Sequence, residues 1–179
     1  YIFADPDKVP DTLGPWNQIV WQKIGNQRFF GLFWSGMPDL NYRNPEVTAE
    51  AYRIADFWLD EMHVDGFRLD AVRHLIEDGD VMVDTPETVA WLKGFAAHVQ
   101  GNGRRPMVVG EVWTHTEVVS DYVQQGALEL AFEFDLAEAI VDAANSGTKD
   151  KLAYALGNVT ASYPPNQLAA FLTNHDQDR

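Results

Sequence analysis

From Thr48 onward the sequence alternates short apolar runs with longer segments whose apolar residues recur every three or four positions. The predicted strands are Val64–Leu69, Pro106–Gly110, Leu128–Phe134 and Leu168–Thr173. Pro106–Gly110 is a short run of the kind that is buried on both faces, and Leu128–Phe134 alternates apolar and polar residues. The three- and four-residue periodicity predicts helices with one apolar face. Strands and helices that take turns favour parallel βαβ units, in either an open doubly wound sheet or an eight-stranded barrel.

The first predicted helix starts with Thr48 as its cap and turns one apolar stripe toward a core. The stripe consists of Ala51, Ile54, Ala55, Trp58, Leu59 and Met62. Before this helix the sequence is rich in Pro, Gly, Asn and Trp and shows no helical period. We therefore expect a domain boundary near Asn44–Pro45.

Three further helices are expected. Thr85–Pro86 supplies a cap and a first-turn proline for one of them, and Gly101–Gly103 is its stop signal. The others are expected at Ala137–Ala144 and Lys149–Val159. The Gly101–Gly103 segment precedes a predicted strand and lacks a third glycine, so it does not indicate a dinucleotide site.

Composition narrows the classes of partner. The chain has 13 basic and 27 acidic residues and a net charge of −14, which would repel a phosphate backbone, so nucleic acid is not expected as a partner. No uncharged apolar stretch approaches the roughly eighteen residues of a membrane span, so no membrane partner is expected either. The absence of cysteine excludes disulfides and thiolate chemistry.

Acidic residues follow three of the predicted strands. Asp70, Glu111 and Asp176 each come at or just beyond a strand end, where parallel sheets and barrels collect reactive groups. A single acid there is adequately explained as a helix cap, but three on three strands favour a catalytic site. Arg68 and Asp70 lie on the same side of their strand, so the guanidinium is expected to keep the Asp70 carboxylate ionised.

The surroundings of two acids predict opposite roles. Glu111 is flanked by the apolar residues Val109 and Val112, which we expect to raise its pKa and let it hold a proton. An ionised nucleophile paired with a protonated acid is what glycoside hydrolysis requires. A retaining mechanism further predicts that the carboxyl groups of Asp70 and Glu111 lie roughly 5 to 5.5 Å apart.

Four motifs, in the correct order, resemble the α-amylase family (glycoside hydrolase family 13). Gly66–His74 is similar to its fourth-strand signature, Val109–Trp113 to its fifth and Phe171–Asp176 to its seventh. Met37–Asn41 resembles the short motif near the end of the domain that this family inserts after the third barrel strand. The chain from Leu32 to Asp176 is compatible with the resemblance throughout.

The resemblance implies an α/β fold, namely a partial TIM (β/α)8 barrel with about strands four to seven. Residues 1–44 would be the C-terminal part of the irregular inserted domain and residues 45–179 the partial catalytic barrel. Earlier strands and the third-strand signature do not precede Tyr1, so the chain is expected to be a fragment that is inactive and poorly folded when isolated.

Site roles also follow from the resemblance. Asp70 would be the nucleophile, Glu111 the general acid/base, and Asp176 the carboxylate that grips sugar hydroxyls and stabilises the transition state. The substrate-binding residues would be Arg68, His175, His74, Arg73, Trp113 and Asn174. Arg73 replaces the lysine of many members, which changes the donor geometry beside the leaving group. No cofactor is needed for the chemistry, but in many members the His74 backbone carbonyl faces a structural Ca2+ ion.

The expected substrate is an α-1,4-glucan or malto-oligosaccharide, because Ala71 after the nucleophile resembles the α-1,4-acting members. A related α-glucosidase, glucosyltransferase or trehalose-forming isomerase is the nearest alternative, since Met37–Asn41 is intermediate between subgroup motifs. A non-catalytic carbohydrate-binding or scaffold barrel is the alternative from another class. Such barrels typically lose one of the acids, and Asp70, Glu111 and Asp176 are all present.

Overall fold

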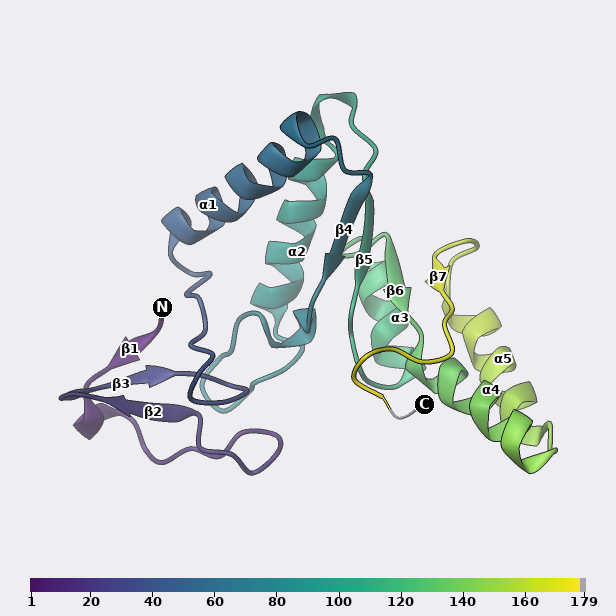
Figure 1. Cartoon of the computed structure of the whole chain (residues 1–179), viewed down its shortest axis with the longest axis horizontal. Coiled ribbons are helices and arrows are strands. Elements are labelled where there is room, and N and C mark those ends of the chain that lie inside the picture. Colours follow the sequence, from purple (N-terminus) through teal and green to yellow (C-terminus); the bar gives the residue numbers. More distant parts are fainter. Residues whose placement is uncertain (178–179) are drawn as a thin grey trace. The chain divides into compact units, whose positions relative to one another are not determined.

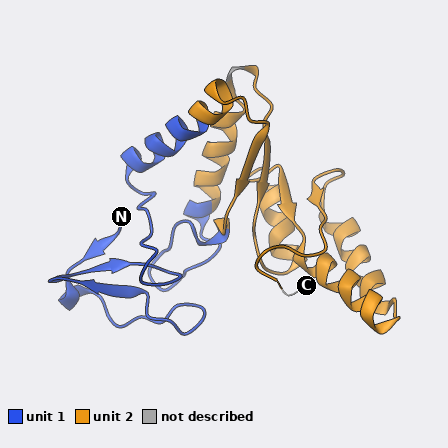
Figure 2. Cartoon of the chain, in the orientation of Figure 1, with its two compact units in different colours: residues 1–55, 73–88 blue, residues 56–72, 89–179 orange. Residues whose placement is uncertain are grey.

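The computed structural model describes residues 1–177 of the chain, apart from the side chain of residue 102. The chain forms two compact units, residues 1–55 with 73–88 and residues 56–72 with 89–179 (Figure 2). This division by packing does not coincide with the boundary expected near Asn44–Pro45. That boundary stays a prediction about the domains of the complete protein.

The first unit contains an antiparallel sheet that the sequence did not predict. Its strands are β1 (Phe3–Ala4), β2 (Trp21–Ile24) and β3 (Gln27–Phe30), in the order β1-β3-β2. Gly25 has φ +56° in the two-residue loop between β2 and β3, a conformation that glycine adopts without steric cost. The buried core of this region consists of Val20, Phe30, Leu32 and Met82. The segment expected to be loop-rich therefore also contains an ordered sheet.

Helix α1 (Pro45–Asp56) begins earlier than predicted. The Asn44 side chain accepts a hydrogen bond from the Glu46 amide at 3.0 Å, and Pro45 occupies the first helical position. A capping side chain followed by proline is a strong start signal, because proline lacks the amide hydrogen that would otherwise go unsatisfied there. Thr48 therefore lies inside the helix, and its predicted role as the cap is wrong.

The apolar stripe predicted for this helix is only partly buried. The helix continues into a π-helical turn at Phe57–Glu61, and within α1 only Ala55 is buried. The larger side chains of the stripe remain 42 to 53 % exposed: Ile54, Trp58 and Met62. Within residues 1–177 these side chains are only partly covered, so the expectation that the stripe faces a core stays a prediction.

The second unit contains the parallel sheet that the sequence predicts. Its strands lie in chain order across the sheet (Figure 1): β4 (Gly66–Leu69), β5 (Met107–Gly110), β6 (Leu130–Phe132) and β7 (Leu168–Ala169). Each neighbouring pair is parallel, which confirms the βαβ prediction. The last two strands are shorter than predicted, since a helix begins soon after β6 and an irregular loop follows β7.

Helix α2 (Pro86–Val99) begins where predicted. The Thr85 hydroxyl accepts a hydrogen bond from the Thr88 amide at 3.1 Å, which confirms Thr85 as the cap. Shorter 3-10 turns occur at Pro6–Lys8, Val72–His74 and Gly101–Gly103. No helix of the described residues is long and apolar enough to cross a membrane.

Three helices follow β5. α3 (Thr116–Gln124) was not predicted. α4 (Phe134–Ser146) extends its predicted helix at both ends, and α5 (Asp150–Ser162) begins one residue later than predicted and ends three residues later. α4 and α5 pack against each other through a small buried cluster: Leu136, Ala139, Ala155 and Val159. α3 begins shortly after Glu111, so its position bears on the candidate site.

Candidate active site

Asp70 and Glu111 directly follow the last paired residues of two neighbouring strands. In the parallel register of β4 and β5, Leu69 pairs with Gly110. The Glu111 amide donates to the Leu69 carbonyl at 2.9 Å, and the Glu111 carbonyl accepts from the Val72 amide at 3.1 Å. Backbone hydrogen bonds therefore fix the two acids beside each other, independently of their side chains.

One guanidinium joins the two carboxylates. Arg68 donates through Nη1 to Asp70 Oδ1 and through Nη2 to Glu111 Oε2. The predicted contact between Arg68 and Asp70 is present, but the contact with Glu111 was not predicted. The two carboxylates differ in exposure, because 74 % of the Asp70 side chain is exposed and only 9 % of the Glu111 side chain.

The backbone after Asp70 adopts a conformation that is uncommon for its residue type. Ala71 has φ +44°, in the left-handed region where a Cβ atom is disfavoured. The next amide, Val72, is tied to the Glu111 carbonyl, which holds the turn in place. Strain of roughly 1–3 kcal/mol at such a residue is typical of functional sites with a supporting structure around them.

Asp176 lies in the loop after β7 instead of at a strand end. β7 stops at Ala169, so the acid lies seven residues beyond the strand, and the predicted strand to Thr173 is wrong. The Asp176 amide donates to Asn174 Oδ1 at 3.0 Å, and His175 Nε2 lies 3.1 Å from Asp176 Oδ2. Within residues 1–177 no hydrogen bond or ion pair joins the Asp176 carboxylate to Asp70 or Glu111.

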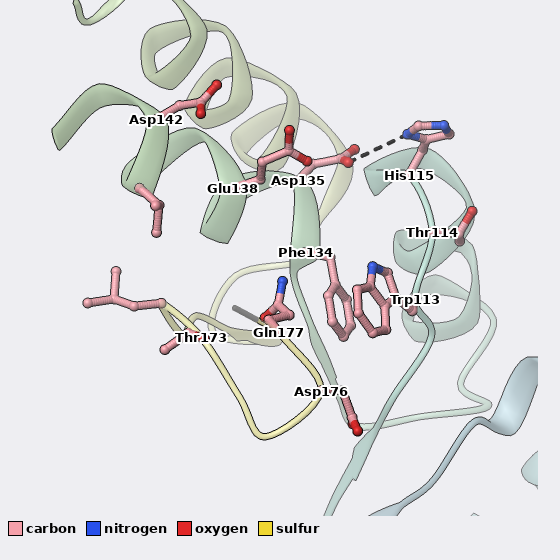
Figure 3. Close-up of a pocket in the computed structure, with 12 residues that line it drawn as sticks. Trp113, Thr114, His115, Phe134, Asp135, Glu138, Asp142, Thr173, Asp176 and Gln177 are labelled. Carbon is pink, nitrogen blue, oxygen red and sulfur yellow. Dashed lines mark ion pairs between the residues drawn. The ribbon is translucent and has the colours of Figure 1, made fainter. Parts of the chain in front are cut away.

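A cavity of about 530 Å3 brings Asp176 together with Trp113. The Trp113 ring stacks on Phe134 with centroids 4.8 Å apart (Figure 3). Phe171 packs edge-on against Phe134 at 5.0 Å. Trp113 remains 47 % exposed. The structure therefore brings Arg68 together with two acids, and separately brings Trp113 together with the third acid; Arg68, Asp70 and Glu111 do not line this cavity.

The sequence missed several residues of this cavity. His115, Phe134 and Asp135 line it, and His115 Nδ1 lies 3.5 Å from Asp135 Oδ1. A sequence signal was available, because the apolar residues Val119, Tyr122 and Val123 recur at helical spacing. This spacing predicts α3, and the start of α3 marks the end of the loop. The contact between His115 in the loop and Asp135 in α4 joins segments that are distant in the sequence, so no local sequence pattern predicts it.

His74 and Arg73 belong to the first unit, where each has its own contacts. His74 Nδ1 lies 3.1 Å from the Met82 carbonyl, and its ring packs near Trp16 and Phe33 at 5.5 and 5.7 Å. Burial lowers the pKa of His74, which favours the neutral ring. The Arg73 guanidinium donates to both carboxylate oxygens of Asp84.

The described residues do not offer a side-chain set for calcium. Within residues 1–177 no group of three or more His, Asp or Glu side chains could hold a metal ion. Calcium prefers six to eight oxygen ligands, usually including carboxylates, so the backbone carbonyl of His74 does not by itself make a site.

Parallel strands that alternate with helices, with Asp70 and Glu111 just beyond two strand ends, define the class as an α/β protein with a candidate site at the carboxyl edge of its sheet. The chain belongs to the α-amylase family. The model of the alpha amylase catalytic domain matches residues 6–179. This match confirms the family that the four sequence motifs predict.

Individual relatives agree with this assignment. Alpha-amylase 3 of Dictyoglomus thermophilum is 33% identical over 167 residues, which cover 91% of this chain and 32% of the relative. The trehalose synthase/amylase TreS of Mycolicibacterium smegmatis is 30% identical over 187 residues, covering 98% of this chain and 29% of the relative. The chain thus spans about a third of the length of these relatives.

A solved structure supports the fold. Amy13B of Eubacterium rectale superposes with a TM-score of 0.74 and 25% identity, covering 98% of this chain and 33% of that structure. The four parallel strands therefore form part of a (β/α)8 barrel, as predicted.

Proposed function

We propose that the complete protein is a retaining glycosidase that hydrolyses α-1,4-linked glucans or malto-oligosaccharides. The contact of the Arg68 guanidinium with both Asp70 and Glu111 carries the proposal. Two carboxylates held by one side chain lie within reach of one glycosidic bond, which is the requirement of double displacement. The relatives named alpha-amylase and trehalose synthase/amylase support an α-glucan as the substrate.

In the proposed reaction Asp70 attacks the anomeric carbon while Glu111 donates its proton to the departing glycosidic oxygen. The bond between that carbon and oxygen breaks, and a covalent glycosyl ester on Asp70 forms. Glu111, now ionised, removes a proton from water, which attacks the ester and releases Asp70. The Glu111 side chain is nearly buried and contacts Arg68, and the exposed Asp70 side chain is accessible to the sugar.

Other residues are proposed to bind the sugar. Asp176 accepts hydrogen bonds from sugar hydroxyls and stabilises the positive charge that develops in the transition state. His175, Asn174, His74 and Arg73 donate to further hydroxyls, and Trp113 stacks on a glucose face. No cofactor is required, because the two carboxylates supply the nucleophile and the proton.

The roles of the two acids can be separated by the leaving group. In the complete protein, we expect Asp70→Asn to lower kcat by about 10³-fold or more for both maltopentaose and 4-nitrophenyl maltoside. Glu111→Gln is expected to lower kcat similarly for maltopentaose but much less for formation of the glycosyl enzyme from the nitrophenyl substrate, because nitrophenolate leaves without a proton. Asp121→Asn, an exposed carboxylate of α3, is the matched control.

Product analysis tests the reaction class. Short maltosides released from maltopentaose with retained anomeric configuration support the hydrolase. Accumulation of trehalose or of longer glucans would instead assign the protein to the isomerase or glucosyltransferase alternative. Unchanged turnover in Glu111→Gln would contradict the proposed acid/base role of that residue, whereas a complete protein that turns over no α-glucan would favour a non-catalytic barrel.

A further inference from the structure

Three consecutive residues at the end of β6 contact the loop that carries Trp113. Phe134 stacks on the Trp113 ring at 4.8 Å (Figure 3). Glu133 Oε1 accepts a hydrogen bond from the Thr116 hydroxyl at 2.8 Å, and Asp135 Oδ2 accepts from the Thr116 amide at 2.9 Å. Phe134 thus contacts Trp113, and Glu133 and Asp135 both hold Thr116 at the end of the same short segment.

Glu133 is a fully buried acid with a hydrogen-bond donor on each oxygen. Its exposed fraction is 0 %, and while Oε1 bonds Thr116, Oε2 accepts from the Tyr163 hydroxyl at 2.6 Å. Burial and the hydrogen bond to Glu133 both raise the pKa of Tyr163, so the phenol keeps the proton that it donates. A buried carboxyl group is costly unless its oxygens are paired, and here the pairing determines where Thr116 lies.

Asp135 replaces the missing cap of α3. The residue at the cap position, His115, makes no side-chain hydrogen bond to the helix. Asp135 accepts from both the amide and the hydroxyl of Thr116, and its second oxygen lies 3.5 Å from the His115 ring. A carboxylate beside the first amide of a helix is favourable, so this contact anchors the far end of the loop to α4.

The loop between β5 and α3 has no regular structure of its own, and Trp113 lies in its middle. One end is held by the backbone bond of Glu111 to Leu69, and the other end by Thr116. Phe134 supports one face of the Trp113 ring, which stays partly exposed. The orientation of the ring therefore depends on its contact with Phe134 and on the anchoring of the loop at both ends.

We propose that Glu133, Phe134 and Asp135 are positioning residues that hold the Trp113 ring in the orientation needed to stack on a glucose unit of the substrate. The inference rests on the proposed glucan-cleaving function and adds three residues to it. Loss of a positioning residue weakens substrate binding through Trp113 and leaves the chemistry of Asp70 and Glu111 in place, because the backbone ladder fixes those acids separately.

The test is a double-mutant cycle in the complete protein with maltopentaose. We expect Asp135→Ala and Phe134→Leu each to raise KM about three- to tenfold, with kcat within about twofold of the parent. In a Trp113→Ala background the same substitutions are expected to cause no further rise in KM. Asp135→Asn, which keeps an acceptor for the Thr116 amide, is expected to restore most of the lost affinity.

Glu117→Ala is the matched control, because Glu117 is an exposed acid in the same first turn of α3. It removes a negative charge without touching the loop, so KM is expected to stay at the parent value. Melting temperatures of all variants identify any that fail to fold, and Phe134→Leu tests the inference if Asp135→Ala does not fold.

The outcomes separate the inference from the proposed function. A parent that cleaves glucans together with unchanged KM in Asp135→Ala and Phe134→Leu overturns the inference alone. The inference is also overturned if Asp135→Ala and Phe134→Leu raise KM equally in the parent and in the Trp113→Ala background. It is overturned as well if Trp113→Ala itself has the KM of the parent. A parent that turns over no α-glucan overturns the proposed function and the inference together.

Discussion

Glu77 provides a pH-dependent test of the first compact unit. Its side chain is buried, and within the described residues Oε1 has no hydrogen-bond partner. Burial, with a smaller contribution from the nearby Asp39 carboxylate, raises the pKa of Glu77 to about 7, although its own amide and Arg43 oppose the shift. The Arg43 guanidinium donates instead to the Glu77 carbonyl, at 2.5 Å, and to Glu87.

The magnitude follows from the two pKa values. A carboxyl group that titrates near 7 in the folded protein and near 4.5 in the unfolded chain changes stability by roughly 3 kcal/mol. The folded state binds the proton more tightly, so the stabilisation is complete below pH 4.5 and is lost as the pH rises through 7. Glu77→Gln cannot ionise, so it is expected to match the parent at pH 5 and to be more stable at pH 8 by roughly 2–3 kcal/mol.

A local measurement suits this prediction because the complete protein contains more than one unit. Hydrogen exchange of the peptide that spans residues 73–88 is measured at pH 5, 6, 7 and 8, corrected for the intrinsic pH dependence of exchange. Protection in the parent is expected to fall with pH, and protection in Glu77→Gln to stay constant. Asp80→Asn, an exposed acid in the same loop, is the control and should follow the parent. If protection from exchange in Glu77→Gln fell with pH as steeply as in the parent, the assigned role of Glu77 would be refuted.

Three further predictions concern the second unit. Tyr163→Phe removes the donor to Glu133 Oε2 and should lower the free energy of unfolding by roughly 1–3 kcal/mol, measured by urea denaturation. Gly66→Ala places a Cβ atom into the backbone of Met107, so β4 must move away from β5; we expect a lower melting temperature and reduced kcat together. In Arg68→Lys the single ammonium group replaces the planar guanidinium that contacts both Asp70 and Glu111, so kcat for maltopentaose should fall roughly 10²-fold. An unchanged kcat would show that these contacts do not contribute to catalysis.

The parallel part of the fold could be predicted from sequence because its signals are local. The strand at Met107–Gly110 is a continuous apolar run, the strand at Gly66–Leu69 is apolar apart from Arg68, and Thr85 caps its helix through a residue three positions away. The antiparallel sheet could not be predicted in the same way. Its strands have two to four residues, and a pair such as Phe3 and Phe29 depends on contact between distant segments.

The same distinction applies to the site. The Arg68–Asp70 contact follows from the two-residue period of one strand, so sequence alone predicts it. The Arg68–Glu111 contact requires the register of β4 against β5, which the sequence does not reveal. The position of Asp176 was harder still, because β7 ends early and the acid lies in a loop whose course depends on its own side-chain contacts.

Two kinds of support hold the site, and they separate the effects of mutation. Asp70 and Glu111 follow paired strand residues, so their placement depends on backbone hydrogen bonds that side-chain substitutions elsewhere leave intact. Trp113 lies on a loop that side chains of the next strand and helix hold in place. Changes to those side chains should therefore alter which glucans bind and how tightly, while the rate of the bond-breaking step stays nearly constant. Substrate range can then vary in this fold without reconstruction of the catalytic pair.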